Sequence, residues 1–484
     1  MLSRLIKKEV LEHLMSLRFA IACVLCLIVV LCSLFVRSQD YTQVLDDWRQ
    51  EMAMERYRLD TLRTPWSLPY EGALVHLQPN PMKIFVRGAA DANGQTLRVN
   101  GRNRVEPIIG RLQNTSVPLF QAIDMVAFVG LILSLMAIVF GYDAICGEKE
   151  RGTLRLMLSY SVPRHQVLLA KWIGGYAVLI LPFLLTVLAG AVIVLIQPDI
   201  SLDAGQWLRL AGILGLGLLY VAVMFSLAIW VSALTGRAST SVMLLLTLWV
   251  VLVLAVPNLS PHVAQTLLPA ANAQEIDSAR DAAARQVWDE LDEKMKQYRK
   301  AHGLAAEQWW QEVNWDSWDD MARVYDMWIY GWPLEKQASL RVLGEFAKIE
   351  QQHEQQVNAQ IDLSRWLSRL SPFSCFALAA TELSDEGLLQ QRRHREQLRV
   401  YQEQFSAYAH DEGLAMEKKY QANRGKSPGL WCNLKEKPVP AFHYVSPAGG
   451  DYMQMVLLDG GILAGATLLL FMLGYLAFLR YDAR

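Results

Sequence analysis

Six long apolar blocks, separated by polar segments, organise this chain. Each block has roughly 17 to 30 residues, and about 20 helical residues at 1.5 Å each cross the hydrocarbon core of a membrane. The blocks cover residues 19–36, 119–142, 167–196, 207–234, 240–256 and 456–478. The pattern predicts an all-α polytopic membrane protein with six transmembrane helices.

Residues 1–18 have a pattern of their own. Their apolar side chains recur at helical spacing, at Leu2, Leu5, Ile6, Val10, Leu14 and Leu17. Charged residues lie off this stripe, as is typical of an amphipathic helix that lies in the membrane interface. The block at 19–36 lacks a small-residue cleavage site, so we expect a membrane anchor that is not removed.

The first long polar segment, 37–118, has a mixed pattern. A helical stretch covers 41–62, and a proline-rich region follows it. The runs at 83–86 and 96–99 are short and rich in apolar residues, which indicates strands. We expect a small mixed segment outside the membrane.

The second long polar segment, 257–454, is almost wholly helical in pattern. Leu398, Tyr401, Phe405 and Tyr408 repeat at helical spacing, which is typical of a seam that faces a partner helix. Prolines and glycines suggest the ends of two long helices, with Pro333 and Pro372 around the first and Gly425 and Pro428 after the second. Two antiparallel helices of about 35 residues would project about 50 Å.

The distribution of Lys and Arg in the short connections predicts the orientation. The basic residues are Arg4, Lys7, Lys8, Arg18, Lys149, Arg151, Arg155, Arg164, Arg237, Arg480 and Arg484, whereas the loop 198–206 has two aspartates and no base. Basic residues concentrate on the cytoplasmic side. We therefore expect both termini, the loop 143–166 and the tail 479–484 in the cytoplasm. The segments 37–118 and 257–454 would then be external. We expect the protein in the cytoplasmic (inner) membrane, with these segments periplasmic or extracellular.

Composition adds little specific chemistry. Hydrophobic residues make up 53% of the chain, charged residues 19%, and the net charge is −1, which gives no reason to expect nucleic-acid binding. Cys23, Cys26 and Cys32 lie inside the first block without a nearby His or carboxylate, so we expect no metal site. Cys375 and Cys432 both fall in the external segment, where a disulfide is an open alternative.

The apolar blocks contain almost no ionisable residues. Lys171 and Asp124 lie near block ends, where a long side chain can reach the interface. An ion-coupled carrier usually needs buried carboxylates or histidines, and the chain has no phosphate-binding Gly-x-x-x-x-Gly-Lys-[Ser/Thr] loop. We expect no cofactor on this chain and an energy source on another subunit.

The loop from Asp143 to Leu158 carries the most informative motif. Its core reads Glu148-Lys-Glu150-Arg151-Gly152-Thr153-Leu154. It resembles the Glu-x-x-x-Gly-Thr-Leu loop between the second and third spans of type-2 ABC exporter permeases, and the match continues through Ser159, Pro163 and Lys171. The alternative is an ordinary amphipathic surface loop.

The resemblance implies a coupling helix that docks into a groove of a separate ATPase. Glu148, Glu150 and Arg151 would then offer charged contacts, Gly152 a close approach, and Leu154, Leu156 and Leu158 an apolar anchor, with Thr153 as a further coupling residue. The resemblance also implies two ATPase subunits, which carry ATP and Mg, and a second copy of the permease or a homologous permease.

Further motifs resemble the gliding-motility and nitrous-oxide-reductase accessory branch of these permeases. They are Asn80-Pro81-Met82 with Phe85 and Gly88, Leu370-Ser371-Pro372, the stretch 379–382, and the closing run 478–482.

Small and aromatic residues suggest contacts with neighbours. Gly212, Gly461 and Gly465 would let helices approach closely. The external segment is rich in tryptophan, which can form a partner surface, a belt at the lipid headgroups or the core of a helical hairpin. The residues are Trp288, Trp309, Trp310, Trp315, Trp318, Trp328 and Trp332.

Three functions remain open from the sequence. The first is a non-catalytic permease subunit that couples ATP hydrolysis on a partner to export of an unidentified substrate. The second is mechanotransmission, in which the external domain acts on a periplasmic partner and nothing crosses the lipid bilayer. The third is a membrane-anchored enzyme or binding module that uses the external domain.

Overall fold

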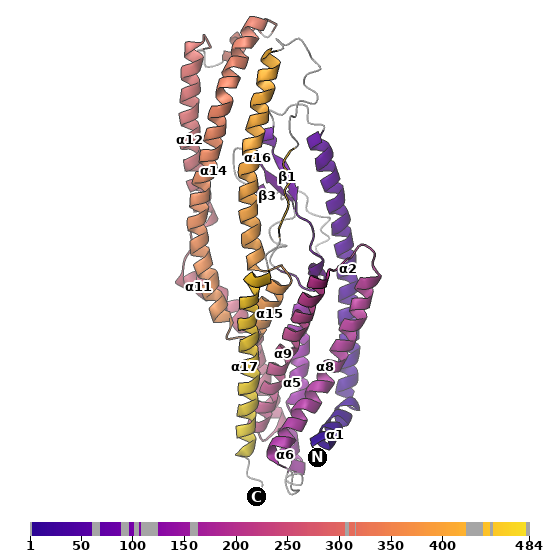
Figure 1. The fold of residues 1–484 in the computed structure, drawn as a ribbon. Helices are drawn as coiled ribbons and strands as arrows, with labels where there is room; N and C mark the ends of the chain where they lie inside the picture. Colours follow the sequence, from indigo (N-terminus) through magenta and orange to yellow (C-terminus); the bar gives the residue numbers. More distant parts are fainter. Residues whose placement is uncertain are drawn as a thin grey trace.

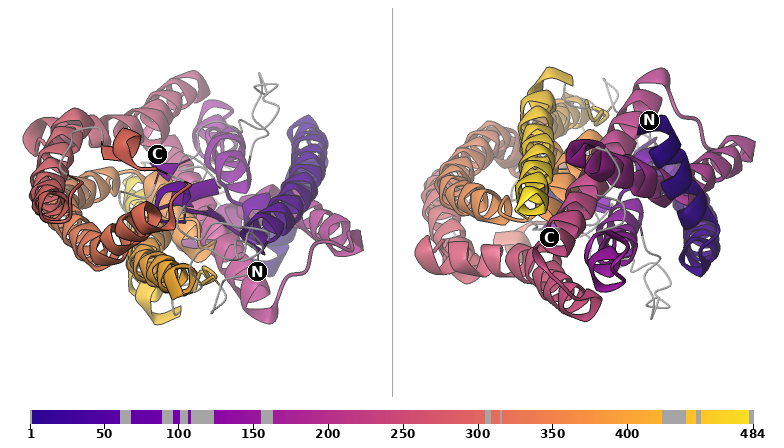
Figure 2. Two further views of the ribbon diagram at one scale, coloured as in Figure 1. Left: turned by 90° about the horizontal axis from the view of Figure 1, so that it is seen from above. Right: turned by 90° about the horizontal axis from the view of Figure 1, so that it is seen from below.

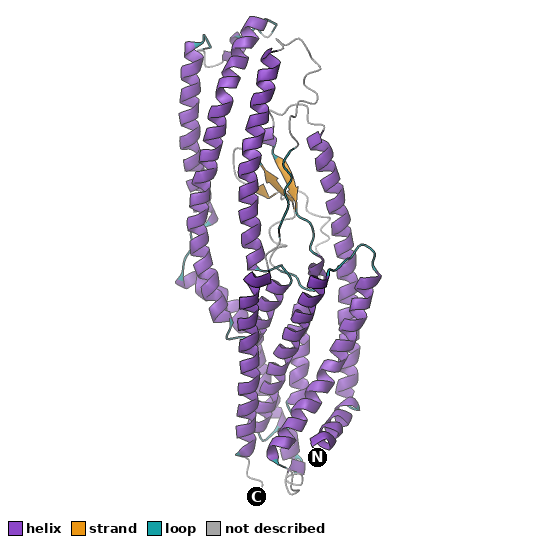
Figure 3. Ribbon diagram, viewed as in Figure 1, coloured by secondary structure: helices purple, strands orange, loops and turns teal. Residues whose placement is uncertain are grey.

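The computed structural model describes most of the chain. The described residues are 2–60, 68–88, 96–100, 106–107, 124–154, 163–304, 309–314, 316–422, 439–445 and 449–480. Several sequence predictions lie outside them, namely those for Leu156, Leu158, Ser159, Trp315, Cys432 and the helix end at 425–428. The described chain is dominated by helix, with one small sheet (Figure 3).

Among the described residues, six helical stretches are long and apolar enough to cross a membrane, so the predicted fold class is confirmed. The continuous helices are α2 (Leu17–Asp60), α8 (Arg164–Ile196), α9 (Ala204–Leu234) and α17 (Gly449–Leu479). The second stretch comprises α4 (Met125–Ala127), η4 (Phe128–Leu133), α5 (Ser134–Gly141) and α6 (Cys146–Glu150). The fifth comprises α10 (Ala238–Trp249), η5 (Val250–Ala255) and α11 (Val256–Leu267).

These stretches form a bundle centred on α9. Helix α9 packs against α17, α5 and α8, and its side chains Tyr220 and Phe225 are fully buried. The short apolar helix α15 (Pro372–Leu383) fits between α9 and α17. By contrast, 11% of the apolar window of the α10–α11 stretch is buried, so most of that stretch faces lipid or another subunit.

The N-terminal segment is helical, as the sequence predicts. Helix α1 (Leu2–Leu14) ends at a turn around Ser16 and packs along α8. Helix α2 then runs without a break from the membrane block into the predicted helix of the first polar segment. No Gly or Pro interrupts residues 17–60, so nothing in the sequence ends the helix at the edge of the apolar block.

Three long helices dominate the part of the molecule opposite the two termini (Figure 1). They are α12 (Ala273–Ala301), α14 (Trp318–Ser368) and α16 (Leu388–Ala422), and the short helix α13 (Trp309–Glu312) lies between α12 and α14. Helix α14 packs on both α12 and α16. Pro333 lies inside α14, so the prediction that it starts a helix is wrong. The two neighbouring helices support α14 where the proline removes a backbone hydrogen bond.

The far tip of this part is aromatic. Trp309 and Trp328 pack around Leu304 and Met327, at the end of the molecule farthest from the membrane bundle (Figure 1). These tryptophans therefore form a small core at the tip, and the sequence alternative of a belt at the lipid headgroups is wrong for them.

A three-stranded antiparallel sheet completes the fold. Strands β1 (Ala73–His76), β2 (Thr96–Val99) and β3 (Glu106–Pro107) lie in that order, with Ala73 opposite Val99 and Leu97 opposite Pro107. The short helix α3 (Leu68–Glu71) precedes the sheet. The sheet packs against Leu398, Tyr401 and Phe405 of α16, so this seam faces strands where a helix was expected.

One predicted strand is correct and the other is wrong. Residues 96–99 form β2, whereas the run 83–86 overlaps the 3-10 helix η2 (Pro81–Ile84). Asn80 caps η2 by accepting a hydrogen bond from the Met82 amide, and Pro81 occupies its first turn. Cap and proline together favour a helical turn over an extended strand. Views along the long axis show α12 and α14 to one side of the bundle (Figure 2).

Candidate functional site

The short helix α6 lies at the end of the bundle that also holds both termini (Figure 1). Its first turn is fixed to α9, because the Ser232 hydroxyl oxygen accepts hydrogen bonds from the amides of Ile145 and Cys146, both at 3.0 Å. The Lys149 ammonium donates to the carbonyls of Ala233 and Thr235 at the end of α9. Helix α6 is therefore held rigidly against α9.

A buried group of three charged side chains ties α6 to two further helices. Lys171 of α8 lies 2.7 Å from Glu148 of α6 and 3.1 Å from Glu9 of α1. The Lys171 side chain is 6% exposed and that of Glu148 is 12% exposed. The expectation that Lys171 reaches the interface is therefore wrong. Two carboxylates partner the ammonium inside the protein, which offsets the cost of burying it.

Gly174 explains how α1 comes so close to α8. A Cβ at this position would lie 2.8 Å from the Glu9 Cβ, closer than side-chain carbons pack. Glycine thus allows Glu9 to reach Lys171, three residues earlier on α8. The role of Glu9 was missed in the sequence, because it sits in the polar face of an amphipathic helix.

The predicted coupling residues divide into an exposed and a buried group. Glu150, Arg151, Gly152 and Thr153 are exposed, whereas Leu154 is fully buried in the main core. Gly152 has a φ of +74° and open space around its Cα, so the left-handed turn there requires glycine or a residue that tolerates this conformation. We name the exposed residues 150–153 the α6 edge.

A second ion pair fixes the loop that precedes α6. Arg18 at the start of α2 donates to both carboxylate oxygens of Asp143, at 3.0 and 2.8 Å. Its guanidinium also lies over the Tyr142 ring, 5.1 Å from the ring centre. The sequence analysis counted Arg18 only as a basic residue near the membrane, so this contact was missed.

At the opposite end of the bundle, the motif Asn80-Pro81-Met82 with Gly88 meets the turn that follows α15. The Asn80 side-chain amide donates to the Ser384 carbonyl at 2.8 Å, and a side chain at Gly88 would collide with the Glu386 backbone. Lys83 lies 3.9 Å from the buried Glu386. The Asn80 motif is therefore part of the contact between η2 and the turn after α15.

The predicted packing glycines behave differently from one another. Gly212 would place a Cβ 3.3 Å from Leu383, so it does face a neighbouring helix of the same chain. Gly461 and Gly465 are exposed and have nothing within 4 Å of a Cβ. A close contact at these two positions would have to come from another molecule.

A buried carboxylate near the start of the last apolar block was missed in the sequence. Asp459 of α17 is fully buried and pairs with Arg369 at 2.6 Å. Residue 459 was visible in the last apolar block of the sequence, and its basic partner lies 90 residues earlier, in a segment expected outside the membrane.

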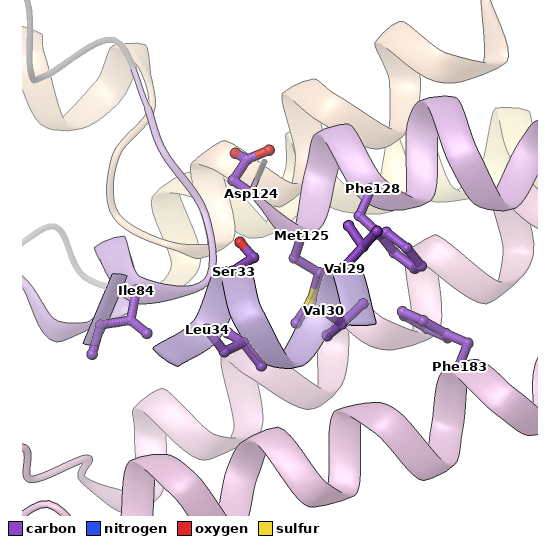
Figure 4. A pocket seen from close by; sticks show the side chains of 9 residues that line it. All are labelled: Val29, Val30, Ser33, Leu34, Ile84, Asp124, Met125, Phe128 and Phe183. Atoms are coloured by element: carbon purple, nitrogen blue, oxygen red, sulfur yellow. The ribbon is translucent and has the colours of Figure 1, made fainter. Parts of the chain in front are cut away.

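One apolar pocket lies between α2, η2, α4 and α8 (Figure 4). Its lining consists of Val29, Val30, Ser33, Leu34, Ile84, Asp124, Met125, Phe128 and Phe183. Asp124 caps α4 by accepting from the Ala127 amide at 2.7 Å, and it also accepts from the Arg87 amide. Its carboxylate therefore has a structural role. Within the described ranges, no group of three or more His, Cys, Asp or Glu could hold a metal ion.

The six spans, the anchored helix α6 and the large domain at the opposite end define a multi-pass membrane protein of the transporter-permease class. The chain belongs to the ABC-2 family of transporter proteins, because the model of this family matches residues 4–483. This confirms the family that the α6 motif indicated.

Two curated relatives support the class. The probable ABC transporter permease protein NosY of Pseudomonas aeruginosa is 32% identical over 173 residues, which are 33% of this chain and 62% of the relative. The protein of the same name from Stutzerimonas stutzeri is 40% identical over 76 residues, 16% of this chain and 27% of the relative. The chain thus spans less than two thirds of each relative. Both relatives are named as ABC transporter permeases, in agreement with the family of this chain.

Proposed function

We propose that this permease couples ATP hydrolysis on a separate ATPase subunit to movement of its spans, and so to export. The observation that carries the proposal is the anchoring of α6. Its inner face is bound to α9 through Ser232 and to α8 and α1 through Lys171. Its outer edge, residues 150–153, is exposed. A partner that pulls on this edge pulls on three helices of the bundle at once.

The strength of the anchoring supports this mechanism. Removing one partner of a buried ion pair costs about 3–5 kcal/mol, because the remaining charge stays buried. Exposed ion pairs contribute only about 0–1 kcal/mol. Contacts from the α6 edge to a partner can therefore form and break in each cycle, while the attachment of α6 to the bundle holds.

The proposal includes an assembly and an orientation. Two ATPase subunits, which would bind ATP and Mg, would dock on α6. Two permease copies would meet along exposed apolar faces such as that of α17 around Gly461. Both termini and α6 would be cytoplasmic and the large domain periplasmic, in the inner membrane. The basic residues around α6 and at both ends of the chain support this direction.

Purification tests the coupling role. The tagged chain, isolated alone, should hydrolyse no ATP, whereas the ATPase that co-purifies from native membranes should be stimulated by it. The triple variant Glu150→Lys, Arg151→Glu, Thr153→Lys should insert normally and lose the ATPase. A matched triple change on the exposed face of α12, at Glu293, Lys294 and Lys300, should retain it. A triple edge variant with unchanged ATPase binding and stimulation would contradict the proposal.

The external domain favours mechanotransmission as a second candidate function. Helix α14 has 51 residues, a length of about 75 Å, and its lower end is bound to α17 by a buried ion pair. Reconstituted vesicles separate the two functions. ATP-dependent accumulation of a compound from a labelled cell extract supports export. ATP-driven movement of the domain with no accumulation supports mechanical action on a periplasmic partner.

A further inference from the structure

The lower end of α14 is joined to α17 by a fully enclosed ion pair. Arg369, just after the last turn of α14, donates through Nε to Asp459 Oδ1 at 2.6 Å and through Nη2 to Oδ2 at 3.4 Å. The two side chains are 9% and 0% exposed. Such a two-point contact fixes direction as well as distance, because the guanidinium and the carboxylate are both planar.

A second pair lies one helical turn away. Arg365 is 3.5 Å from Glu382 of α15, and its Nη2 lies 3.3 Å from the sulfur of Met455. Arg365 and Arg369 are four residues apart on α14, and Met455 and Asp459 are four residues apart on α17. The end of α14 and the part of α17 around Asp459 therefore point in the same direction, with matching positions in contact.

These side chains add a link between α14 and α17 that the packing of the helices does not supply. Helix α14 packs mainly on α11, α12 and α16, while α15 packs on α17 and α9. Because α11 ends the fifth membrane stretch, α14 also reaches the bundle through α11. Burial raises the pKa of Glu382, and the charge of Arg365 opposes this shift. Four charged residues thus tie the end of α14 to α15 and α17, and we name them the α14 joint: Arg365, Arg369, Glu382 and Asp459.

We infer that the α14 joint transmits movement of the span α17 to the external helices α12 and α14. The inference rests on the proposed ATPase-driven movement of the spans. It names the residues through which mechanotransmission, the second candidate function, would act. A rotation of about 5° at the base of a lever about 75 Å long moves its tip by about 6 Å. A small shift of α17 would therefore reach the aromatic tip as a displacement large enough to act on a partner.

The experiment measures movement of the external domain by single-molecule FRET. Dyes attached at Lys348→Cys on α14 and Arg56→Cys on α2 report the distance between the two exposed helix faces, in a background with Cys23 and Cys32 replaced by Ser. The complex with the co-purified ATPase is examined without nucleotide and with ATP and vanadate. ATP hydrolysis is measured on the same preparations.

Neutralising the joint should uncouple the domain without uncoupling the ATPase. The double variant Arg369→Gln, Asp459→Asn should keep ATP hydrolysis within about twofold of wild type, while its nucleotide-dependent FRET change falls below half. The exchanged pair Arg369→Asp, Asp459→Arg should recover most of the change. Arg369→Lys keeps the charge but loses the two-point geometry, so its FRET change should lie between those of wild type and the double variant. This single variant replaces the double variant if the latter does not fold.

An exposed ion pair on the same helix provides the matched control. Arg341 of α14 lies 2.8 Å from Glu290 of α12, with side chains 55% and 43% exposed, and Arg341→Gln with Glu290→Gln should leave the FRET change intact. The joint is ruled out if its neutral variant retains the full change, or if wild type shows no change while ATP hydrolysis is stimulated. A wild-type complex without stimulated hydrolysis would overturn the proposed function, and the α14 joint would then have no ATPase-driven movement to transmit.

Discussion

Lys171 of α8 holds the carboxylate of Glu148 at 2.7 Å, in an interior that solvent hardly reaches. Glu148 belongs to the motif that resembles a coupling loop, and as an exposed residue it would have been a contact for a partner. The structure gives it an internal role, in which it joins α6 to the bundle. Contacts with a partner would then be made by the α6 edge.

Removal of this ammonium should destabilise the protein strongly. Lys171→Met leaves the carboxylates of Glu148 and Glu9 buried next to each other, which we expect to cost about 3–5 kcal/mol. The control is Lys8→Met, because Lys8 pairs with Glu12 on the exposed face of α1 and should cost less than about 1 kcal/mol. Thermal unfolding of the purified proteins compares them. Equal melting temperatures for the two variants would contradict the burial of the Lys171 group.

Substitutions at Gly152 separate the effect of backbone conformation from the effect of side-chain size. Its φ is +74° and the space around it is open, so Gly152→Trp should insert and fold but push a docked ATPase away. Gly152→Asn is the control, because Asn tolerates the left-handed conformation at a cost of about 1 kcal/mol or less. ATP hydrolysis stimulated by the permease should be lost in the Trp variant and largely kept in the Asn variant.

This pair of variants also tests the turn itself. If both lose stimulation to the same degree, the backbone conformation matters and close approach does not. If both keep it, this turn does not contact the ATPase.

The glycines of α17 should affect assembly and leave the fold of the single chain unchanged. Gly461 and Gly465 meet nothing within 4 Å, so replacing both with Leu should keep the melting temperature within about 2 °C and shift the oligomer towards the monomer in light scattering. Gly175→Leu is the contrasting variant, because a Cβ there lies 2.6 Å from the Phe225 ring. It should lower the melting temperature instead. An unchanged oligomer in the α17 variant would place these glycines against lipid.

The sequence predicts the features that repeat locally and misses those that depend on distant partners. Six spans follow from block length, and the amphipathic α1 follows from its stripe. The prediction of a strand at 83–86 is wrong because Asn80 and Pro81 start a helical turn. This local signal outweighed the apolar run that follows. The prediction that a helix starts at Pro333 is wrong for the opposite reason, because packing by α12 and α16 maintains helix α14 on both sides of the proline.

The candidate site shows the same division. The motif around Gly152 drew attention to the segment that contains α6, but no periodicity reveals that Glu148 and Leu154 point inwards. Glu148 turns towards Lys171, 23 residues later, which also binds Glu9, far earlier in the chain, and Leu154 enters the main apolar core. The joint of Arg369 and Asp459 spans 90 residues, so only the fold could pair a charge in the last apolar block with one in a polar segment.

Labelling from outside the cell tests the proposed orientation. Lys300 at the end of α12 and Arg151 at the α6 edge are both exposed and lie at opposite ends of the molecule (Figure 1). An impermeant maleimide should label Lys300→Cys in intact cells and should label Arg151→Cys only after permeabilisation. Labelling of the parent protein gives the background from its own cysteines. The reverse pattern would invert the topology and move α6 away from any cytoplasmic ATPase.

His394 of α16 should make the domain built by α12, α14 and α16 sensitive to acid. Its ring lies against Phe442 and Tyr444, and among the described residues neither ring nitrogen has a hydrogen-bond partner. Burial lowers the pKa of His394 to about 4, whereas an unfolded histidine has a pKa of about 6.5. The folded state therefore keeps the ring neutral over a range in which the unfolded state binds a proton.

The sign of the effect follows from this difference. Above about pH 6.5 neither state is protonated at this residue and stability does not depend on it. As the pH falls from 6.5 towards 4, the unfolded state gains protons first and the protein loses about 1–2 kcal/mol, a value reduced because the ring is only partly buried. His394→Phe should remove this contribution, so its melting temperature should fall less than that of wild type between pH 7 and pH 4.5. The exposed His262→Gln provides the control and should follow wild type. A His394→Phe protein with the wild-type pH dependence would show that another group causes the acid sensitivity.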